Sequence, residues 1–215
     1  MKTRILGLVL GAGLLVSLAC QAATARRPKP QDKPQPAPAV KLAPAVEKVV
    51  NAAHTQAEVT KTYDPAYTSI PYPNGDVPRE KGVCTDVVVR AFRDGAKVDL
   101  QKDVHEDMAR NFSVYPKKWG LKKPDTNIDH RRVPNLMTFF TRQGKALPVS
   151  RDSKEYQPGD VVAWDMGGGL LHIGIMSSEW DAGVGRFKVV HNVGWGVAIE
   201  DRLFDWKIIG HYRYF

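Results

Sequence analysis

The chain has 215 residues and a mass of 23.9 kDa, which is enough for one ordinary domain with or without a tail. Hydrophobic residues make up 43% and charged residues 25%, a globular composition that excludes wholesale disorder. The formal charge of +8 would suit nucleic acid. However, residues 1–45 hold seven basic and one acidic residue, and the remainder holds 24 basic and 22 acidic ones. The basicity therefore belongs to the tail, and the sequence predicts no nucleic-acid partner.

Residues 1–22 have the features of an export signal. A positively charged start precedes an apolar run over residues 5–18, which is shorter than a membrane span. Two processing routes fit the small residues that follow. Cleavage after Ala22 or Ala25 releases a soluble protein, whereas cleavage before Cys20 leaves a lipid-modified cysteine. Both routes predict export to the periplasm or cell envelope, and the second adds attachment to the membrane.

Two cysteines, Cys20 and Cys84, and a proline-rich stretch set the domain organisation. Residues 26–45 contain six prolines, so residues 23–45 are predicted to be an extended linker before a folded domain over 46–215. Because Cys20 is either removed or lipidated, the mature domain has one thiol without a disulfide partner. A single thiol is either reactive or a buried, inert hydrophobe, and the count alone does not decide between them.

The domain begins with helices and ends with strands. Apolar residues at helical spacing predict four helices, over 46–60, 83–94, 101–112 and 133–143. Gly95 is predicted to cap the second helix at its end. Short apolar runs bounded by glycine-rich turns predict four strands, over 161–164, 171–177, 186–192 and 211–215. Helices followed by antiparallel strands predict an α+β fold.

Cys84 lies at the predicted start of the second helix. Unpaired backbone N–H groups and the positive end of the helix dipole favour a thiolate at such a position. An inert core cysteine would more often lie within the apolar stripe of the helix. The sequence therefore predicts a lowered pKa for Cys84 and a nucleophilic role.

Two histidines of the predicted hairpin are candidate partners for this thiol. If strands 171–177 and 186–192 pair symmetrically, His172 and His191 lie opposite each other, and one can act as general base while the other orients it. Gly174 is predicted to keep that face of the strand open, whereas alternation sends Asn192 to the opposite face. The alternatives are structural histidines, or a metal site completed by Cys84 or Asp86.

The sequence motifs resemble those of the NlpC-type cell-wall cysteine peptidases. The matching segments are Gly82-Val83-Cys84-Thr85-Asp86, Gln157-Pro158-Gly159-Asp160, His172-Ile173-Gly174-Ile175 and Val190-His191-Asn192. Residues 46–215 resemble more closely the YijF-like bacterial family, a domain of unknown function. The specific features shared with that family are the long polar motif over residues 124–135 and the glycine turn over 167–169.

This resemblance implies a papain-like fold of circularly permuted order, in which the cysteine-bearing helices pack on a small antiparallel sheet. It implies that Cys84 is the nucleophile, His172 the general base and His191 the third polar member. Tyr72 would match the tyrosine that those enzymes place near the cysteine. The usual Asp-Cys-Ser-Gly motif reads Val83-Cys84-Thr85-Asp86 here, which leaves the oxyanion donors and the role of Asp86 open.

Together these features predict an exported cysteine hydrolase, an amidase or endopeptidase acting on amide bonds of peptidoglycan peptides. Asp86, Asp129, Arg131 and Arg132 are the expected substrate-binding residues besides Tyr72, with the arginines gripping a carboxylate unless they are structural. A monomer without metal or cofactor is expected. The competing hypotheses are a cell-wall binding or scaffolding domain on a degenerate peptidase fold, and an exported metal-binding protein.

Overall fold

The computed structural model describes residues 34–215. The predicted signal peptide and the first part of the predicted linker lie outside these residues. Within residues 34–215, no helix has both the length and the apolar character needed to cross a membrane. Residues 34–43 have no regular structure, yet the Gln35 N–H donates to Ala182 O at 2.9 Å and the Trp180 indole donates to Gln35 O at 2.8 Å. The end of the predicted linker therefore lies along a hairpin of the domain.

The helices fall close to the predicted ranges. The α-helices of the described part are α1 (Pro44–Val59), α2 (Cys84–Ala96), α3 (Leu100–Asn111) and α4 (Val133–Arg142), accompanied by short 3₁₀ turns η1 (Phe112–Val114), η2 (Asp129–Arg131) and η3 (Ser153–Glu155). Proline occupies the first turn of α1 and of α4, where its missing N–H costs no hydrogen bond. Apolar spacing was therefore sufficient to locate each α-helix.

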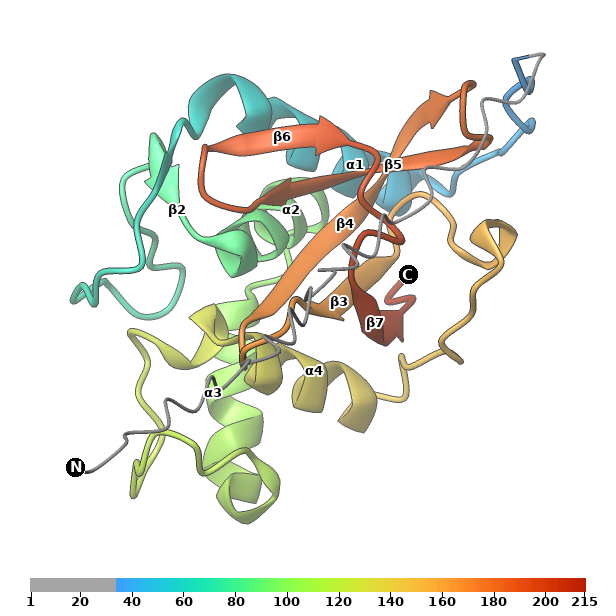
Figure 1. The fold of residues 1–215 in the computed structure, drawn as a ribbon. Helices are drawn as coiled ribbons and strands as arrows, with labels where there is room; N and C mark the ends of the chain where they lie inside the picture. Colours follow the sequence, from blue (N-terminus) through green and yellow to red (C-terminus); the bar gives the residue numbers. More distant parts are fainter. Residues whose placement is uncertain (1–33) are drawn as a thin grey trace, which may run out of the picture. The chain divides into compact units, whose positions relative to one another are not determined.

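A five-stranded antiparallel sheet forms the second half of the domain. Its order is β6-β5-β4-β3-β7, built from β3 (Val161–Asp165), β4 (Leu171–Asp181), β5 (Arg186–Asn192), β6 (Val197–Glu200) and β7 (Lys207–Tyr212). A separate parallel pair joins β1 (Thr62–Tyr63) to β2 (Lys81–Gly82). Helices α1 and α2 lie side by side against the sheet (Figure 1). This architecture confirms the predicted α+β class.

The sheet separates two hydrophobic layers. Alternate residues of β3 and β4, among them Ala163 and Ile173, face the helices and join a core that also contains Cys84. The intervening residues, among them Trp164 and Met176, face the other way and pack with Trp206 and Leu203. Residues of β4 that differ by one position therefore face different surroundings.

Gly95 has a different role from the predicted one. Helix α2 continues through Gly95 to Ala96 and ends at Lys97, whose φ of 61° is left-handed. A Cβ at Gly95 would lie 2.6 Å from backbone atoms of Val49 on α1. The prediction of a C-cap at Gly95 is therefore wrong, because glycine is needed there for the close approach of the two helices.

Candidate active site

Cys84 is the first residue of α2 and is almost fully buried, with 5% of its surface exposed. Burial raises the pKa of Cys84 to about 12, although hydrogen bonds from the backbone N–H groups of Ile173, Thr85 and Cys84 itself oppose this shift. The prediction of a lowered pKa is therefore wrong for this structure. The expected helix N-terminus is present, but removal of the sulfur from water outweighs it.

The two histidines are in direct contact. Nε2 of His172 lies 2.8 Å from Nδ1 of His191, and the ring centroids are 5.0 Å apart. Both side chains are buried, His172 on β4 and His191 on β5. The structure therefore brings together the two histidines that the sequence predicted to lie close to each other.

The strand register that achieves this contact differs from the predicted one. In the ladder between β4 and β5, Ile175 pairs with Val190. In the same register His191 lies opposite Gly174 rather than opposite His172. The symmetric hairpin is wrong because the turn lies further along the chain than predicted, with Asp181 paired to Arg186, and the register shift between Met176 and Trp180 recovers only part of this offset. The histidines are diagonal neighbours on one face, so their rings still meet.

Gly174 makes this diagonal contact possible. A Cβ at this position would lie 2.9 Å from Val190 O and 3.1 Å from His191 Cβ. Glycine therefore lets β5 approach β4 closely and leaves space for the His191 ring to reach His172. The sequence correctly pointed to an open position beside His172, but the space serves the second histidine.

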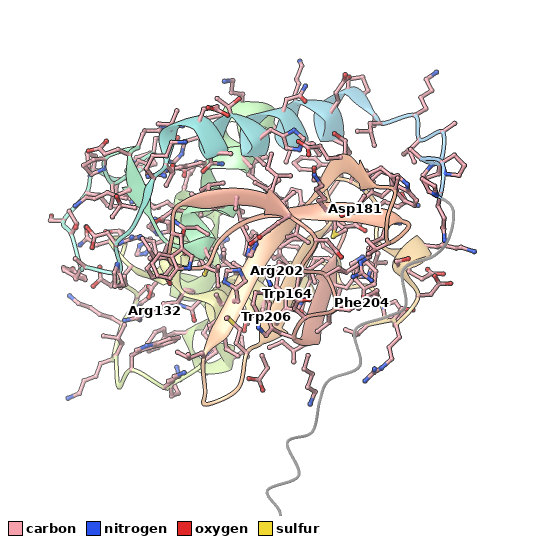
Figure 2. The ribbon with its side chains drawn as sticks, turned by 45° about the horizontal axis from the view of Figure 1, so that its top comes forward. Arg132, Trp164, Asp181, Arg202, Phe204 and Trp206 are labelled. Atoms are coloured by element: carbon pink, nitrogen blue, oxygen red, sulfur yellow. The ribbon has the colours of Figure 1, made fainter. Side chains whose placement is uncertain are left out.

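The side chains of His172 and Cys84 lie on opposite sides of β4. The His172 ring packs against Trp164 and Trp206, with centroid distances of 5.7 and 5.6 Å, on the face away from α2. Figure 2 shows these two tryptophans close together over the sheet. The Cys84 thiol meets the N–H of Ile173, the next residue along the strand. Among residues 34–215, no hydrogen bond joins the thiol to either histidine ring.

A cavity of about 220 Å³ opens beside the thiol. Its walls combine apolar and cationic side chains, and none of the described lining residues is acidic: Tyr63, Pro65, Val83, Cys84, Lys118, Trp119, Ile128, Arg131, Arg132, Val133, Pro134, Gly169 and Leu171. The predicted polar motif thus forms one wall of the cavity through Ile128, Arg131 and Arg132. The cavity suits an acyl group that carries negative charge.

Arg131 and Asp86 form a buried ion pair. The Arg131 Nε and Nη2 atoms donate to Asp86 Oδ1 and Oδ2 at 2.9 and 3.0 Å, and the same guanidinium donates to the carbonyls of Asp64 and Ala66. Asp86 also accepts the N–H of Val83 at 2.7 Å. Both residues are thereby committed to holding the segment before Cys84. Each charge is already paired inside the protein, although Arg131 also lines the cavity, so substrate binding by these two residues stays a prediction.

Arg132 and Asp129 have separate roles. The Arg132 guanidinium lies 4.1 Å from the centre of the Trp119 ring and 3.3 Å from Asp129 Oδ1, and it lines the cavity. Figure 2 shows Arg132 well apart from Trp164 and Trp206. Asp129 is 1% exposed and also binds the Asp125 N–H. Arg132 thus lines the cavity, whereas Asp129 contacts Arg132 and does not line the cavity.

The tyrosine at the cysteine is Tyr63 rather than Tyr72. Burial raises the pKa of Tyr63 to about 12, assisted by the charges of Cys84 and Asp86 and by a hydrogen bond from its hydroxyl to Cys84. The Tyr72 ring instead packs against His105, with centroids 5.1 Å apart, and does not line the cavity. Sequence matching chose the wrong tyrosine because the pairing of β1 with β2, which brings Tyr63 next to Gly82, was not predicted.

Sequence reasoning also missed Glu200. Its Oε1 atom lies 3.1 Å from Nε2 of His191 and 3.3 Å from Nε of Arg202. Glu200 ends β6, a strand that was not predicted, although the alternation of Val197 to Glu200 gave a weak signal for it. The histidine pair therefore continues to a carboxylate at the edge of the sheet.

Both imidazoles are held in the neutral form. Burial lowers the pKa of His172 to about 3, with repulsion from His191 as a smaller cause. Burial also lowers the pKa of His191, opposed by the charge and hydrogen bond of Glu200.

No group of three or more His, Cys, Asp or Glu side chains suited to a metal ion occurs within residues 34–215. Asn192 faces away from the pair and donates to Gly82 O at 3.1 Å, which fixes the segment before Cys84.

Residues 50–214 match a family model described as a domain of unknown function, DUF1287. The chain belongs to this family. It is also similar to the uncharacterized protein YijF of Escherichia coli strain K12, with 55% identity over 167 residues that cover 78% of this chain and 80% of the relative. The predicted YijF-like resemblance is thereby confirmed over nearly the whole folded domain. In this DUF1287 chain the match includes the cavity wall, the Cys84 helix and the histidine hairpin.

Proposed function

We propose that this DUF1287 chain is an exported cysteine hydrolase, an amidase or endopeptidase that cleaves amide bonds in peptidoglycan peptides. The proposal depends chiefly on the His172–His191 contact of 2.8 Å, located one residue along β4 from the backbone group that meets the Cys84 thiol. A helix-borne cysteine ahead of an antiparallel sheet with two linked histidines also supports a papain-like fold of NlpC type. Its site of action would be the periplasm or cell envelope, where the chain acts as a soluble monomer or as a lipoprotein anchored through Cys20.

The reaction requires the thiol and the His172 ring to come within hydrogen-bond distance. This requires more than the tightening of a loose contact, because the His172 ring lies on the face of β4 away from α2 and has to turn towards the thiol near the start of the strand. The Cys84 sulfur then attacks the amide carbonyl carbon while its proton passes to Nδ1 of His172. The tetrahedral intermediate expels the amine, which takes that proton, and a thioester remains on Cys84. Water, activated by His172, hydrolyses the thioester and restores the thiol.

Backbone N–H groups at the start of α2 are placed to stabilise the oxyanion of this intermediate. The N–H groups of Thr85, Cys84 and Ile173 already contact the sulfur. The positive end of the helix dipole adds to their effect. Their position does not depend on the sequence after the cysteine, so the missing Ser-Gly of the usual motif does not remove the donors.

The cavity favours a substrate with a carboxylate near the scissile amide. Lys118, Arg131 and Arg132 are its cationic lining residues; Arg131 is paired with Asp86, and Arg132 contacts the buried Asp129 at 3.3 Å. Pro65, Ile128 and Leu171 supply apolar contact. Peptidoglycan peptides carry carboxylates next to their amide bonds, so they suit this combination.

Digestion of purified sacculi tests the proposed activity. Wild type and Cys84→Ala are incubated with sacculi, and new amino and carboxyl termini are identified by mass spectrometry. We expect new termini with wild type and none with Cys84→Ala, whose fold is checked by circular dichroism. Cys20→Ala, the matched control at the other cysteine, should digest like wild type. Equal product profiles for wild type and Cys84→Ala would refute the hydrolase.

The burial of Cys84 supports a second candidate, a non-catalytic domain that binds or scaffolds the cell wall. A thiol that is 5% exposed, with a pKa raised to about 12, has little nucleophilic thiolate in this conformation. Such a domain would sediment with sacculi and release no products. The same experiment therefore separates the two candidates when bound protein is measured together with released peptides.

A further inference from the structure

Glu200 connects the histidine pair to the edge of the sheet. It ends β6, where it pairs with Val189 of β5, two residues before His191. Its Oε1 atom lies 3.1 Å from His191 Nε2, and the opposite nitrogen of that ring, Nδ1, lies 2.8 Å from His172 Nε2. Carboxylate, imidazole and imidazole thus form one continuous row of hydrogen bonds.

We infer that Glu200 is a positioning residue that sets the tautomers of both imidazoles, so that Nδ1 of His172 carries no proton. The inference about catalysis rests on the proposed hydrolase, whereas the inference about the tautomers rests on the hydrogen bonds alone. It assigns a role to a residue that the sequence motifs did not include.

The direction of the row follows from the donors and acceptors. An ionised carboxylate only accepts, so Nε2 of His191 must carry the proton that lies between them. A neutral imidazole has a single N–H, which leaves Nδ1 of His191 as an acceptor. His172 must then donate from Nε2 and has no proton on Nδ1. The neutral state of both rings agrees with the burial that lowers their pKa values.

Arg202 uses both oxygens of Glu200 as acceptors. Arg202 approaches both carboxylate oxygens, at 3.3 Å from Oε1 and 3.4 Å from Oε2, and itself pairs with Asp205 at 2.7 Å. The charged groups around His191 are therefore Glu200, Arg202 and Asp205, and the neighbouring ring is His172. Since a guanidinium only donates, both contacts from Arg202 use lone pairs of the Glu200 carboxylate.

For the proposed hydrolase, this is the tautomer that a general base needs. When the Cys84 proton reaches Nδ1 of His172, the ring becomes a cation that still donates from Nε2 to His191. The negative charge of Glu200 at the other end of the row stabilises that cation through His191. Without the carboxylate neither tautomer would be favoured. In a fraction of the molecules His172 would then carry its proton on Nδ1 instead of Nε2.

Nuclear magnetic resonance of the full chain labelled with ¹⁵N-histidine tests the tautomers directly. The ring nitrogens are assigned from spectra of His172→Gln and His191→Gln, and wild type is compared at neutral pH with Glu200→Gln. We expect wild-type His172 to be protonated on Nε2 only. In Glu200→Gln the amide can accept or donate, so a measurable fraction of His172 should shift to the Nδ1–H form. Glu179→Gln is the matched control, since Glu179 lies on β4 and pairs with Lys188 at 3.1 Å.

Kinetics on released wall peptides provide the second measurement. Glu200→Gln should lower kcat by about 10- to 100-fold, as is usual when an outer partner of a functional histidine is lost, with KM unchanged. Glu179→Gln should leave both constants unchanged. Protonation of wild-type His172 on Nδ1, or unaltered tautomers in Glu200→Gln, would overturn the inference. If wild type hydrolyses nothing while Glu200→Gln still shifts the tautomers, the hydrolase fails and the positioning role of Glu200 stands.

Discussion

Two effects shift the pKa of the Cys84 thiol in opposite directions. Three backbone N–H groups stabilise the thiolate locally, and the loss of water around a sulfur that is 5% exposed destabilises it. Desolvation prevails and raises the pKa to about 12. A hydrolase with such a thiol would be protected from oxidation and alkylation at rest and would be activated only when substrate brings His172 within reach.

The alkylation rate of Cys84 should show this protection. At pH 8 its thiolate fraction, and hence its reaction with iodoacetamide, should be roughly a thousandfold lower than for free cysteine. The rate should rise about tenfold per pH unit as long as the fold persists, because the thiol is still protonated in that range. Peptide mapping by mass spectrometry measures the modification, with the urea-unfolded chain as control. A native rate equal to the unfolded one would show that the thiol is not shielded.

Among the elements, the packing of α1 on α2 determines where Cys84 lies. Gly95 allows backbone atoms of Val49 to come within 2.6 Å of the position that a Cβ would occupy. Gln56 of α1 also donates to Val87 O at 3.0 Å, in the turn after Cys84. These contacts hold the axis of α2, and therefore the direction in which its first residue points.

Gly95→Ala should destabilise the domain although alanine is the better helix former. Helix propensity favours the substitution by about 1 kcal/mol. The clash with the backbone of Val49 opposes it, and overpacking of this kind costs about 1–3 kcal/mol, so the net change should be a loss. Urea unfolding measures the free energy of unfolding. Asn51→Ala, at an exposed position of α1, is the control and should change it by less than about 0.5 kcal/mol. An increase in the free energy of unfolding for Gly95→Ala would show that the two helices can move apart without loss of stability.

The elements themselves were largely predictable, and the contacts between them were not. Apolar spacing located four helices and the strands around His172 and His191, because local periodicity reflects burial. The position of the turn between β4 and β5 and the register shift after Met176 are not visible in local periodicity, so a symmetric hairpin gave the wrong pairing. Glu200 and Tyr63 were missed because each lies on a short strand whose partner is distant or weakly patterned.

At the scale of the whole molecule, charge is divided between the tail and the folded domain. The domain holds nearly equal numbers of acidic and basic residues, and many of them are paired internally, such as Arg131 with Asp86 and Arg213 with Asp160. The excess of positive charge lies within residues 1–45. The sequence therefore predicted the electrostatic character of each part, since net charge needs no knowledge of the fold.

Binding of the full chain to anionic cell-wall polymer should depend on the linker charges and on salt. The attraction acts between exposed charges, and the screening length is about 10 Å at 0.1 M salt, so binding should weaken as salt rises. Cosedimentation with sacculi at low and high NaCl measures it. A variant with glutamine at the basic linker positions should bind weakly at both concentrations: Arg26, Arg27, Lys29, Lys33 and Lys41. Lys102→Gln with Arg110→Gln, at exposed positions of α3, is the control and should bind like wild type, because both cations already pair with Glu106. Equal, salt-independent binding of wild type and the linker variant would place recognition in the domain instead.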